Sequence, residues 1–195
     1  MGSEMCIRDR QGNGTSIKRE DQYMTDVHGD EAVRYIEQLR DPNKPFFLYV
    51  PFLAPHSPMQ APEELEDKYS KRRNRPFPKR TYAAMVDSLD QAVGKVLESL
   101  ETQGLAENTL VFFFSDNGGL KAFGADNSPY RGGKLETFEG GIRVNAIMRW
   151  PEKSRREQRV RMSCLFSMFF RLSRMPQAYP WRMIKNWMVK TAGRR

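Results

Sequence analysis

The chain has 195 residues, of which 39% are hydrophobic and 11% aromatic, so it is long and apolar enough to form a domain with a buried core. Its formal net charge is +8, but residues 151–195 carry +10 and residues 11–150 carry −2, which argues against a nucleic-acid-binding surface on the main part of the chain. The sequence has no run of 18 apolar residues that would predict a membrane span, and Cys6 and Cys164 form neither a disulfide framework nor a metal-binding motif.

The first part of the chain predicts a helix, a turn and a buried strand. In residues 30–40 the apolar side chains recur at helical spacing, with acids at the start and Arg40 at the end. The sequence DPNK then predicts a turn. Residues 45–55, PFFLYVPFLAP, form a continuous apolar run of strand length, which is typical of a strand covered on both faces.

Two helices and two further strands are predicted beyond this point. Residues 61–70 indicate a short helix started by proline, and residues 81–104 a long amphipathic helix with Gly104 at its C′ position. Residues 108–115 and 141–150 indicate buried strands. The basic run KYSKRRNRPFPKR, residues 68–80, favours a solvated loop, and a rim that attracts phosphate or sulfate is the alternative.

Buried strands alternating with helices are the pattern of a parallel sheet that is covered by helices on both faces. Ligands of such sheets bind beyond the carboxyl ends of the strands. Two polar segments follow predicted strands in this chain, APHSP at residues 54–58 and SDNGG at residues 115–119. These segments are therefore the first candidates for a functional site.

Asp116 and Asn117 offer a carboxylate and an amide oxygen side by side, which suits a hard cation such as Ca²⁺ or Mg²⁺. Gly118 and Gly119 permit close approach of the backbone. The alternative is an Asp-Asn-Gly turn that closes a hairpin, and this stretch alone favours that alternative.

His56 lies between two prolines of APHSP, where a parallel sheet keeps its site, although a structural histidine is the alternative reading. His28 carries no such argument. The segment RGGKLETFEGG, residues 131–141, combines paired glycines with Arg131 and Lys134, as a site for a tetrahedral anion requires. An ordinary flexible loop is the alternative, and the segment is not a Walker loop.

Taken together, these stretches resemble the sulfatase family of the alkaline-phosphatase superfamily. PFFLYVPFLAPHSPMQAPEE, TYAAMVDSLDQAVGKVLESLETQGLAENTLVFFFSDNGG and SPYRGGKLETFEGGIRVNAIMRWP match the middle of the family sequence from about residue 23 to residue 151. The resemblance implies an α/β fold, here a partial α/β/α sandwich with a mostly parallel sheet and irregular ends. It also implies hydrolysis of sulfate esters at a Ca²⁺ site, with Mg²⁺ as the second choice.

The resemblance also implies roles for individual residues. Asp116 and Asn117 are similar to two of the metal ligands, and Lys134 to the lysine that contacts the sulfate and the nucleophile. His56 is similar to the histidine that holds the sulfate or protonates the leaving oxygen. Arg131 falls within the family motif without an assigned step. The expected substrate is a sulfated small molecule or carbohydrate, and neither a nucleic acid nor a membrane is expected as a partner.

The family nucleophile, a formylglycine made from the cysteine or serine of C-x-P-S-R or S-x-P-S-R, is not found in this chain. Residues 6–10, CIRDR, have Arg8 and Asp9 in place of Pro and Ser, and MGSEMCIRDR resembles translated sequencing-adapter sequence. We therefore expect residues 1–10 to be a non-native leader and residues 11–151 to be a partial catalytic domain. The polypeptide as written is expected to be inactive, and its parent enzyme to be periplasmic or secreted.

The tail, residues 152–195, departs from the family pattern, in which L-D-G is expected. Residues 186–189, NWMV, must be encoded AAY-TGG-ATG-GTN, which reads Leu-Asp-Gly from the third base. Residues 167–172 allow Asp-Val-Phe-Pro-Thr in the same shifted frame. We therefore expect a frameshifted or disordered tail, with the shift between residues 151 and 168. A genuine basic amphipathic segment is the alternative.

Two other functions stay open from the sequence. A phosphodiesterase or phosphonate hydrolase of the same superfamily often uses more His and Asp ligands, and the two histidines of this chain do not favour it. A non-catalytic basic binding protein would show salt-dependent binding of DNA or heparin that survives deletion of residues 1–150.

Overall fold

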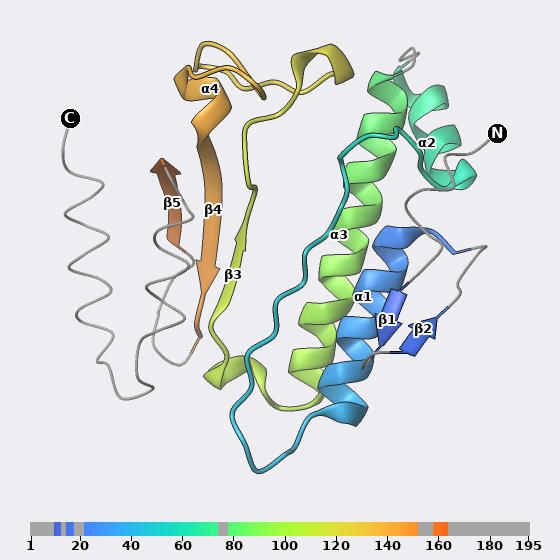
Figure 1. Cartoon of the computed structure of the whole chain (residues 1–195), viewed down its shortest axis with the longest axis vertical. Helices are drawn as coiled ribbons and strands as arrows, with labels where there is room; N and C mark the ends of the chain where they lie inside the picture. Colours follow the sequence, from blue (N-terminus) through green and yellow to red (C-terminus); the bar gives the residue numbers. More distant parts are fainter. Residues whose placement is uncertain (1–9, 13–14, 18–21, 74–77, 152–157, 164–195) are drawn as a thin grey trace. The chain divides into compact units, whose positions relative to one another are not determined.

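The computed structural model describes residues 10–12, 15–17, 22–73, 78–151 and 158–163. The chain divides into two compact units, residues 1–104 and residues 105–195, and each unit is described separately. Figure 1 shows the helices of the first unit and the three-stranded sheet of the second. Among the described helices, none combines the length and apolar character needed to cross a lipid bilayer.

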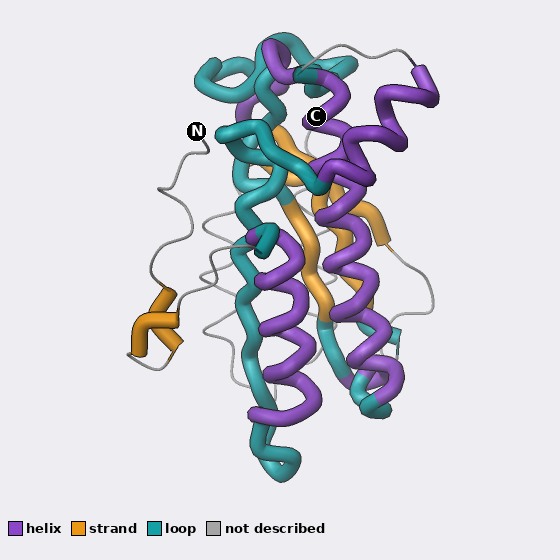
Figure 2. The backbone as a smooth tube through the Cα atoms, turned by 90° about the vertical axis from the view of Figure 1, so that its right-hand side faces the viewer, coloured by secondary structure: helices purple, strands orange, loops and turns teal. Residues whose placement is uncertain are grey.

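The first unit is built on two helices that pack side by side, α1 (Met24–Arg34) and α3 (Lys79–Thr102), as Figures 1 and 2 show. The helix predicted over residues 30–40 is confirmed, but it begins at Met24 and ends in a π-helical turn, η2 (Tyr35–Leu39). His28 therefore lies within a helix rather than before one.

The interface between α1 and α3 is closely packed because Gly29 carries no side chain. A Cβ atom added at Gly29 would lie 3.0 Å from the Cβ atom of Ala92. Polar bonds on both sides of this contact also join the two helices, from Ser88 Oγ to Asp26 Oδ1 over 3.3 Å and from Lys95 Nζ to Asp30 Oδ1 over 2.9 Å. The buried apolar residues of this unit are Met24, Val27, Ala32, Ile36, Ala54, Ala84, Met85, Ala92 and Leu100.

The predicted end of the long helix is confirmed. Gly104 has φ of 67°, the left-handed conformation expected at C′, and its N–H donates to the carbonyl of Glu101 over 3.0 Å. The short helix is also confirmed as α2 (Glu63–Arg73).

The prediction of a solvated loop over residues 68–80 is wrong for most of that run. Residues 68–73 belong to α2 and residues 79–80 to α3, while residues 74–77 lie outside the described part. Lys68 pairs with Asp87, and Arg80 Nη2 lies 3.1 Å from Glu66 Oε2. The charges thus connect two helices.

Residues 45–55 are not part of either sheet formed by the described strands. Their burial nevertheless alternates along the segment as in a strand. Phe47, Tyr49 and Leu53 are each more than half exposed, at 67%, 61% and 51%, which differs from the strand covered on both faces that the sequence predicts.

The second unit contains β3 (Val111–Phe114), β4 (Arg143–Arg149) and β5 (Gln158–Ser163) in the spatial order β3-β4-β5. The strands predicted over residues 108–115 and 141–150 are confirmed, although β4 begins at Arg143 because a short helix, α4 (Glu139–Ile142), precedes it. The burial predicted for the first of them is not confirmed, since Phe113 of β3 is 41% exposed. Val144, Ala146 and Met148 form its buried face.

The mostly parallel sheet expected from the sequence is not confirmed by the described strands. Both pairs in this sheet are antiparallel, with Phe113 opposite Ile147 and Ala146 opposite Val160. Between β3 and β4 the described chain forms only the short helices η4 (Lys121–Phe123) and α4. Because a parallel pair usually needs a crossover helix, the return in the opposite direction has a simple physical basis.

The sequence predicts irregular chain ends, but short strands occur near both ends. β5 lies within residues 152–195, where an irregular tail is predicted, and pairs with β4 over its whole length. Near the N-terminus, β1 (Arg10–Gly12) and β2 (Thr15–Ile17) form an antiparallel pair. The predicted adapter sequence, apart from Arg10, and most of the predicted frameshifted tail lie outside the described residues.

Candidate functional site

The polar segment that follows β3 is not a hairpin turn. β3 and β4 are neighbours, but residues 115–142 separate them along the chain, so SDNGG does not close the pair. Ser115 Oγ donates to the carbonyl oxygen of Asn117 over 2.9 Å, which stabilises the bend. Asp116 is exposed and Asn117 is half-buried. The hairpin alternative for the acid–amide pair is therefore wrong.

Glycines hold this segment against the loop that precedes β4. The N–H of Gly118 donates to the carbonyl oxygen of Gly141 over 2.9 Å. A Cβ atom at Gly118 would overlap the carbonyl oxygen of Gly140. In the same way, a Cβ atom at Gly140 would lie 2.6 Å from the carbonyl oxygen of Arg131. A Cβ atom at Gly133 would lie 2.7 Å from the carbonyl oxygen of Gly119. We call this backbone-to-backbone contact of Gly118, Gly133, Gly140 and Gly141 the glycine junction.

The side chain of Asn127 strengthens the glycine junction with three hydrogen bonds. Its Oδ1 accepts from the N–H of Gly119 over 2.9 Å, and its Nδ2 donates to the carbonyl of Gly119 over 2.8 Å. Nδ2 also donates to the carbonyl of Gly132 over 3.2 Å. Sequence reasoning missed Asn127, because an asparagine before Ser-Pro has the same pattern as an ordinary turn former.

Lys134 is joined to the same junction through its backbone. Its N–H donates to the carbonyl oxygen of Gly119 over 3.2 Å, and its side chain is half-buried. The segment bearing Asp116 and Asn117 and the segment bearing Lys134 therefore lie against each other within one unit. This is the arrangement that a site for a cation and a tetrahedral anion requires.

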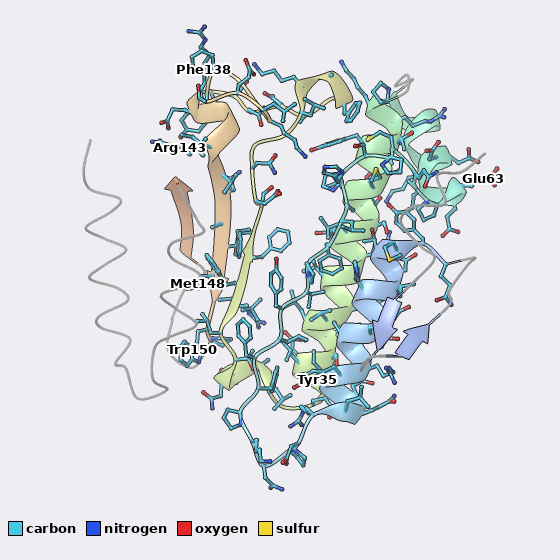
Figure 3. All side chains as sticks on the ribbon, viewed as in Figure 1. Tyr35, Glu63, Phe138, Arg143, Met148 and Trp150 are labelled. Atoms are coloured by element: carbon cyan, nitrogen blue, oxygen red, sulfur yellow. The ribbon has the colours of Figure 1, made fainter. Side chains whose placement is uncertain are left out.

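Two arginines near the junction stack on aromatic rings. The guanidinium carbon of Arg131 lies 3.9 Å from the ring centroid of Phe138, and that of Arg143 lies 5.0 Å from the ring of Tyr130. Arg143 also donates to the Tyr130 hydroxyl, which raises the pKa of the guanidinium, and pairs with Glu139 over 2.6 Å. Figure 3 shows Phe138 and Arg143 near α4, at the end of β4 opposite Met148 and Trp150. These contacts stabilise the loop before β4.

His56 lies in the first unit, after the extended residues 45–55. Its backbone N–H donates to the carbonyl of Leu53 over 2.8 Å, and its ring atom Nδ1 lies 2.7 Å from the carbonyl oxygen of Ser57. Because a carbonyl oxygen only accepts, Nδ1 carries the proton of this bond and Nε2 is the atom left for chemistry. His56 is exposed. Its meeting with Asp116, Asn117 and Lys134, which lie in the other unit, stays a prediction.

Among the residues that the structure describes, a metal ion would find only part of its coordination shell. The part of the chain that the structure describes contains no group of three or more His, Cys, Asp or Glu side chains suited to hold a metal. Asp116 and Asn117 are neighbouring oxygen donors on a braced bend and fit a hard cation, but Ca²⁺ takes six to eight oxygen ligands. The remaining ligands would have to come from elsewhere.

Comparison with known proteins identifies the chain's relatives. The family model described as Sulfatase matches residues 4–170, and thus extends beyond both ends of the stretch whose resemblance the sequence itself reveals. A protein named Sulfatase from Formosa agariphila is 41% identical over 140 residues, covering 66% of this chain and 25% of that protein. Arylsulfatase J of Mus musculus is 39% identical over 129 residues, covering 66% of this chain and 21% of that protein.

Solved structures also resemble this chain. The crystal structure of Ps i-CgsB in complex with k-i-k-neocarrahexaose is similar at 40% identity with a TM-score of 0.67, covering 72% of this chain and 31% of that one. A putative sulfatase from Bacteroides fragilis has 24% identity and a TM-score of 0.56, which supports the fold alone. The chain spans about a quarter of the length of the curated relatives it matches.

Proposed function

The chain belongs to the sulfatase family and has an alkaline-phosphatase-like α/β fold, and we propose that it is a central part of a sulfuric ester hydrolase. In this proposal the loops after β3 and before β4 hold a divalent cation and the sulfate group of the substrate. Most of the parent sheet is expected to be parallel, with additional strands contributed from outside the described residues.

The observation that carries the proposal is the glycine junction. Gly118 bonds to Gly141 and Lys134 bonds to Gly119, so two segments far apart in sequence are fixed against each other. One segment bears a carboxylate and an amide, and the other an ammonium group. Rigid backbone contact of this kind supports a preorganised site, because it holds charged groups in place before the substrate arrives.

The proposed roles follow from the chemistry of a sulfate ester, in which negative charge develops on the bridging oxygen as the bond to sulfur breaks. Asp116 and Asn117 would ligate Ca²⁺, which when bound withdraws charge from the sulfuryl oxygens. Lys134 would hold the same oxygens through its ammonium group. His56 would hold the sulfate or give a proton to the leaving oxygen. Because Nδ1 already donates its proton to Ser57, both tasks would require the imidazolium form, in which Nε2 also carries a proton.

The parent enzyme would use a formylglycine nucleophile, and the residue that forms it is missing from this sequence. Neither C-x-P-S-R nor S-x-P-S-R occurs in the chain, and Cys6 is followed by Ile7, Arg8 and Asp9. We therefore propose that the 195-residue polypeptide binds its ligands weakly and does not turn them over.

Sulfated carbohydrates are the proposed substrate class, with aryl sulfates as the second choice. Ps i-CgsB, which resembles this chain, was crystallised with a neocarrahexaose. N-acetylgalactosamine-6-sulfatase of Canis lupus familiaris, 35% identical over 140 residues, is named for a sulfated sugar. These names support a sugar sulfate without selecting one.

Ligand binding by the purified chain tests the proposal. We expect Ca²⁺ and inorganic sulfate to shift the NMR signals of Asn117 and Lys134, because weak binding is visible by this method. Lys134→Met should weaken sulfate binding about tenfold by removing a charge-assisted contact, and Asp116→Asn should weaken Ca²⁺ binding about tenfold. Lys44→Met is the matched control, since Lys44 pairs with Asp41 on the surface of the other unit. Equal binding by all variants would contradict the proposed site.

A further inference from the structure

Leu135, the residue after Lys134, combines two features that its packing does not explain. Its φ is 74°, and it is the one residue other than glycine with a positive φ in the described part of the chain. Its relative exposure is 90%, the highest among the exposed large hydrophobic residues of the described part. A left-handed conformation costs free energy for a leucine, and an exposed leucine contributes little burial in return.

The turn that contains Leu135 would normally favour another residue. The N–H of Glu136 donates to the carbonyl oxygen of Gly133 over 3.0 Å, which closes a four-residue turn with Leu135 at its third position. Turns with a positive φ at this position usually have glycine or asparagine there. Within the described part of the chain, neither local backbone geometry nor the core therefore accounts for a leucine.

The turn is also fixed in place, so that Leu135 cannot easily relax. A Cβ atom at Gly141 would lie 2.5 Å from the carbonyl oxygen of Gly133 and would overlap that of Glu136. Lys134, in the middle of the turn, is bonded through its N–H to Gly119. The exposed leucine is thus presented from a braced turn, directly beside the lysine proposed to hold sulfate.

We infer that Leu135 is a specificity-determining residue, which contacts the apolar part of the sulfate ester. This inference rests on the proposed function. A sulfate ester has a charged sulfate group, which Lys134 and the cation would bind. Its organic group would extend out of the site along the neighbouring protein surface. Leu135 offers that group an apolar surface, suited to an aryl ring or to the C–H face of a sugar ring.

The size of the expected effect follows from the area of such a contact. Partial burial of one leucine side chain against a ring corresponds to a change in affinity of about threefold to tenfold. Inorganic sulfate has no organic part, so its affinity should not depend on residue 135. The difference between ligands, rather than the affinity for any one of them, is therefore the informative quantity.

The experiment compares ligands and variants by NMR titration of the full 195-residue chain in the presence of Ca²⁺. The probes are inorganic sulfate, methyl sulfate and 4-nitrophenyl sulfate. For wild type we expect 4-nitrophenyl sulfate to bind more tightly than methyl sulfate. Leu135→Gly and Leu135→Asn should lose this preference by about threefold to tenfold while keeping the affinity for inorganic sulfate. Leu39→Ala, at an exposed leucine of η2, should leave the preference unchanged.

Thermal unfolding provides the second readout, because glycine and asparagine accept the left-handed conformation. Leu135→Gly and Leu135→Asn should therefore melt no lower than wild type. A fall in melting temperature would show that Leu135 packs against the protein, and would overturn the inference.

Failure of the inference can be distinguished from failure of the proposed function. If inorganic sulfate binds near Lys134 but the preference for 4-nitrophenyl sulfate does not change with residue 135, only the role of Leu135 is wrong. If inorganic sulfate does not bind near Lys134, the proposed site is wrong and the role of Leu135 falls with it.

Discussion

Gly118 accepts no side chain, because a Cβ atom there would overlap the carbonyl oxygen of Gly140. The neighbouring backbone cannot move aside without breaking the hydrogen bond from Gly118 to Gly141. Gly94, in the middle of α3, is the opposite case, since nothing lies within 4 Å of a Cβ atom built there. Close backbone approach therefore requires glycine at position 118, whereas position 94 would also accept a side chain.

Gly118→Ala should therefore destabilise the second unit by about 1–3 kcal/mol through overpacking. Trp150 is the one tryptophan among the described residues and lies in that unit, so denaturant unfolding followed by tryptophan fluorescence measures the effect. Sulfate and Ca²⁺ binding should weaken in parallel, because the two loops would separate.

Gly94→Ala is the matched control for this prediction. It should leave the tryptophan transition unchanged and stabilise α3 by about 0.5–1 kcal/mol, since alanine favours a helix interior over glycine. Far-UV circular dichroism, which is dominated by the helices, would report that gain. An unaltered tryptophan transition in Gly118→Ala would show that the glycine junction adapts to a side chain and does not fix the site.

At the scale of elements, Asp87 of α3 accepts three hydrogen bonds, and two of them come from α2. The Asp87 carboxylate accepts hydrogen bonds from Lys68, from Tyr69 Oη over 2.9 Å and from Gln91 Nε2 over 2.9 Å. The bond from Lys68, followed by that from Gln91, lowers the pKa of the Asp87 carboxyl below its usual value. The side chain of Asp87 is only 12% exposed, so solvent screens these bonds incompletely.

Asp87→Asn should destabilise the first unit by about 1 kcal/mol at neutral pH, as the loss of a charged acceptor implies. Because the folded-state pKa of Asp87 is lowered, its stabilisation is present above the unfolded pKa of about 4 and is lost as the pH falls through the folded value. The difference between variant and wild type should accordingly shrink in acid. Thermal unfolding at pH 7 and in acid, followed by circular dichroism, measures this.

Asp90→Asn removes the same charge from an exposed position of the same helix. It should change stability little at either pH, since exposed charges contribute little. An effect of Asp90→Asn as large as that of Asp87→Asn would assign the change to net charge rather than to the contact between α2 and α3.

The elements that the sequence predicts well are those with a local signal. The amphipathic period of residues 81–104 and the C′ glycine depend on neighbours in sequence, and both are confirmed in α3 and Gly104. Strand direction has no such signal, because an apolar run has the same pattern in parallel and antiparallel pairs. The sequence predicts the helix over residues 61–70 but not its continuation over residues 71–73, where the basic run favours a loop.

For the whole molecule, the sequence predicts which residue types form the candidate site but not what brings them together. Chemistry and resemblance predict Asp116, Asn117 and Lys134. The glycine junction and the bonds of Asn127 are visible only in the three-dimensional structure. A close backbone approach leaves no side-chain pattern beyond the glycines themselves. The role of His56 stays a prediction, since it depends on a contact between the two units.

Catalysis is the property that this polypeptide should lack even where its binding loops form. A covalent step needs a nucleophile, and the sequence offers neither C-x-P-S-R nor S-x-P-S-R, while the described residues supply at most part of a metal shell. Purified chain incubated with Ca²⁺ and 4-nitrophenyl sulfate should therefore release no more 4-nitrophenol than buffer does. The Lys134→Met variant serves as a blank, because any release that persists in it does not arise at the proposed site. Release by wild type that is abolished by Lys134→Met would mean that another group of this chain acts as the nucleophile.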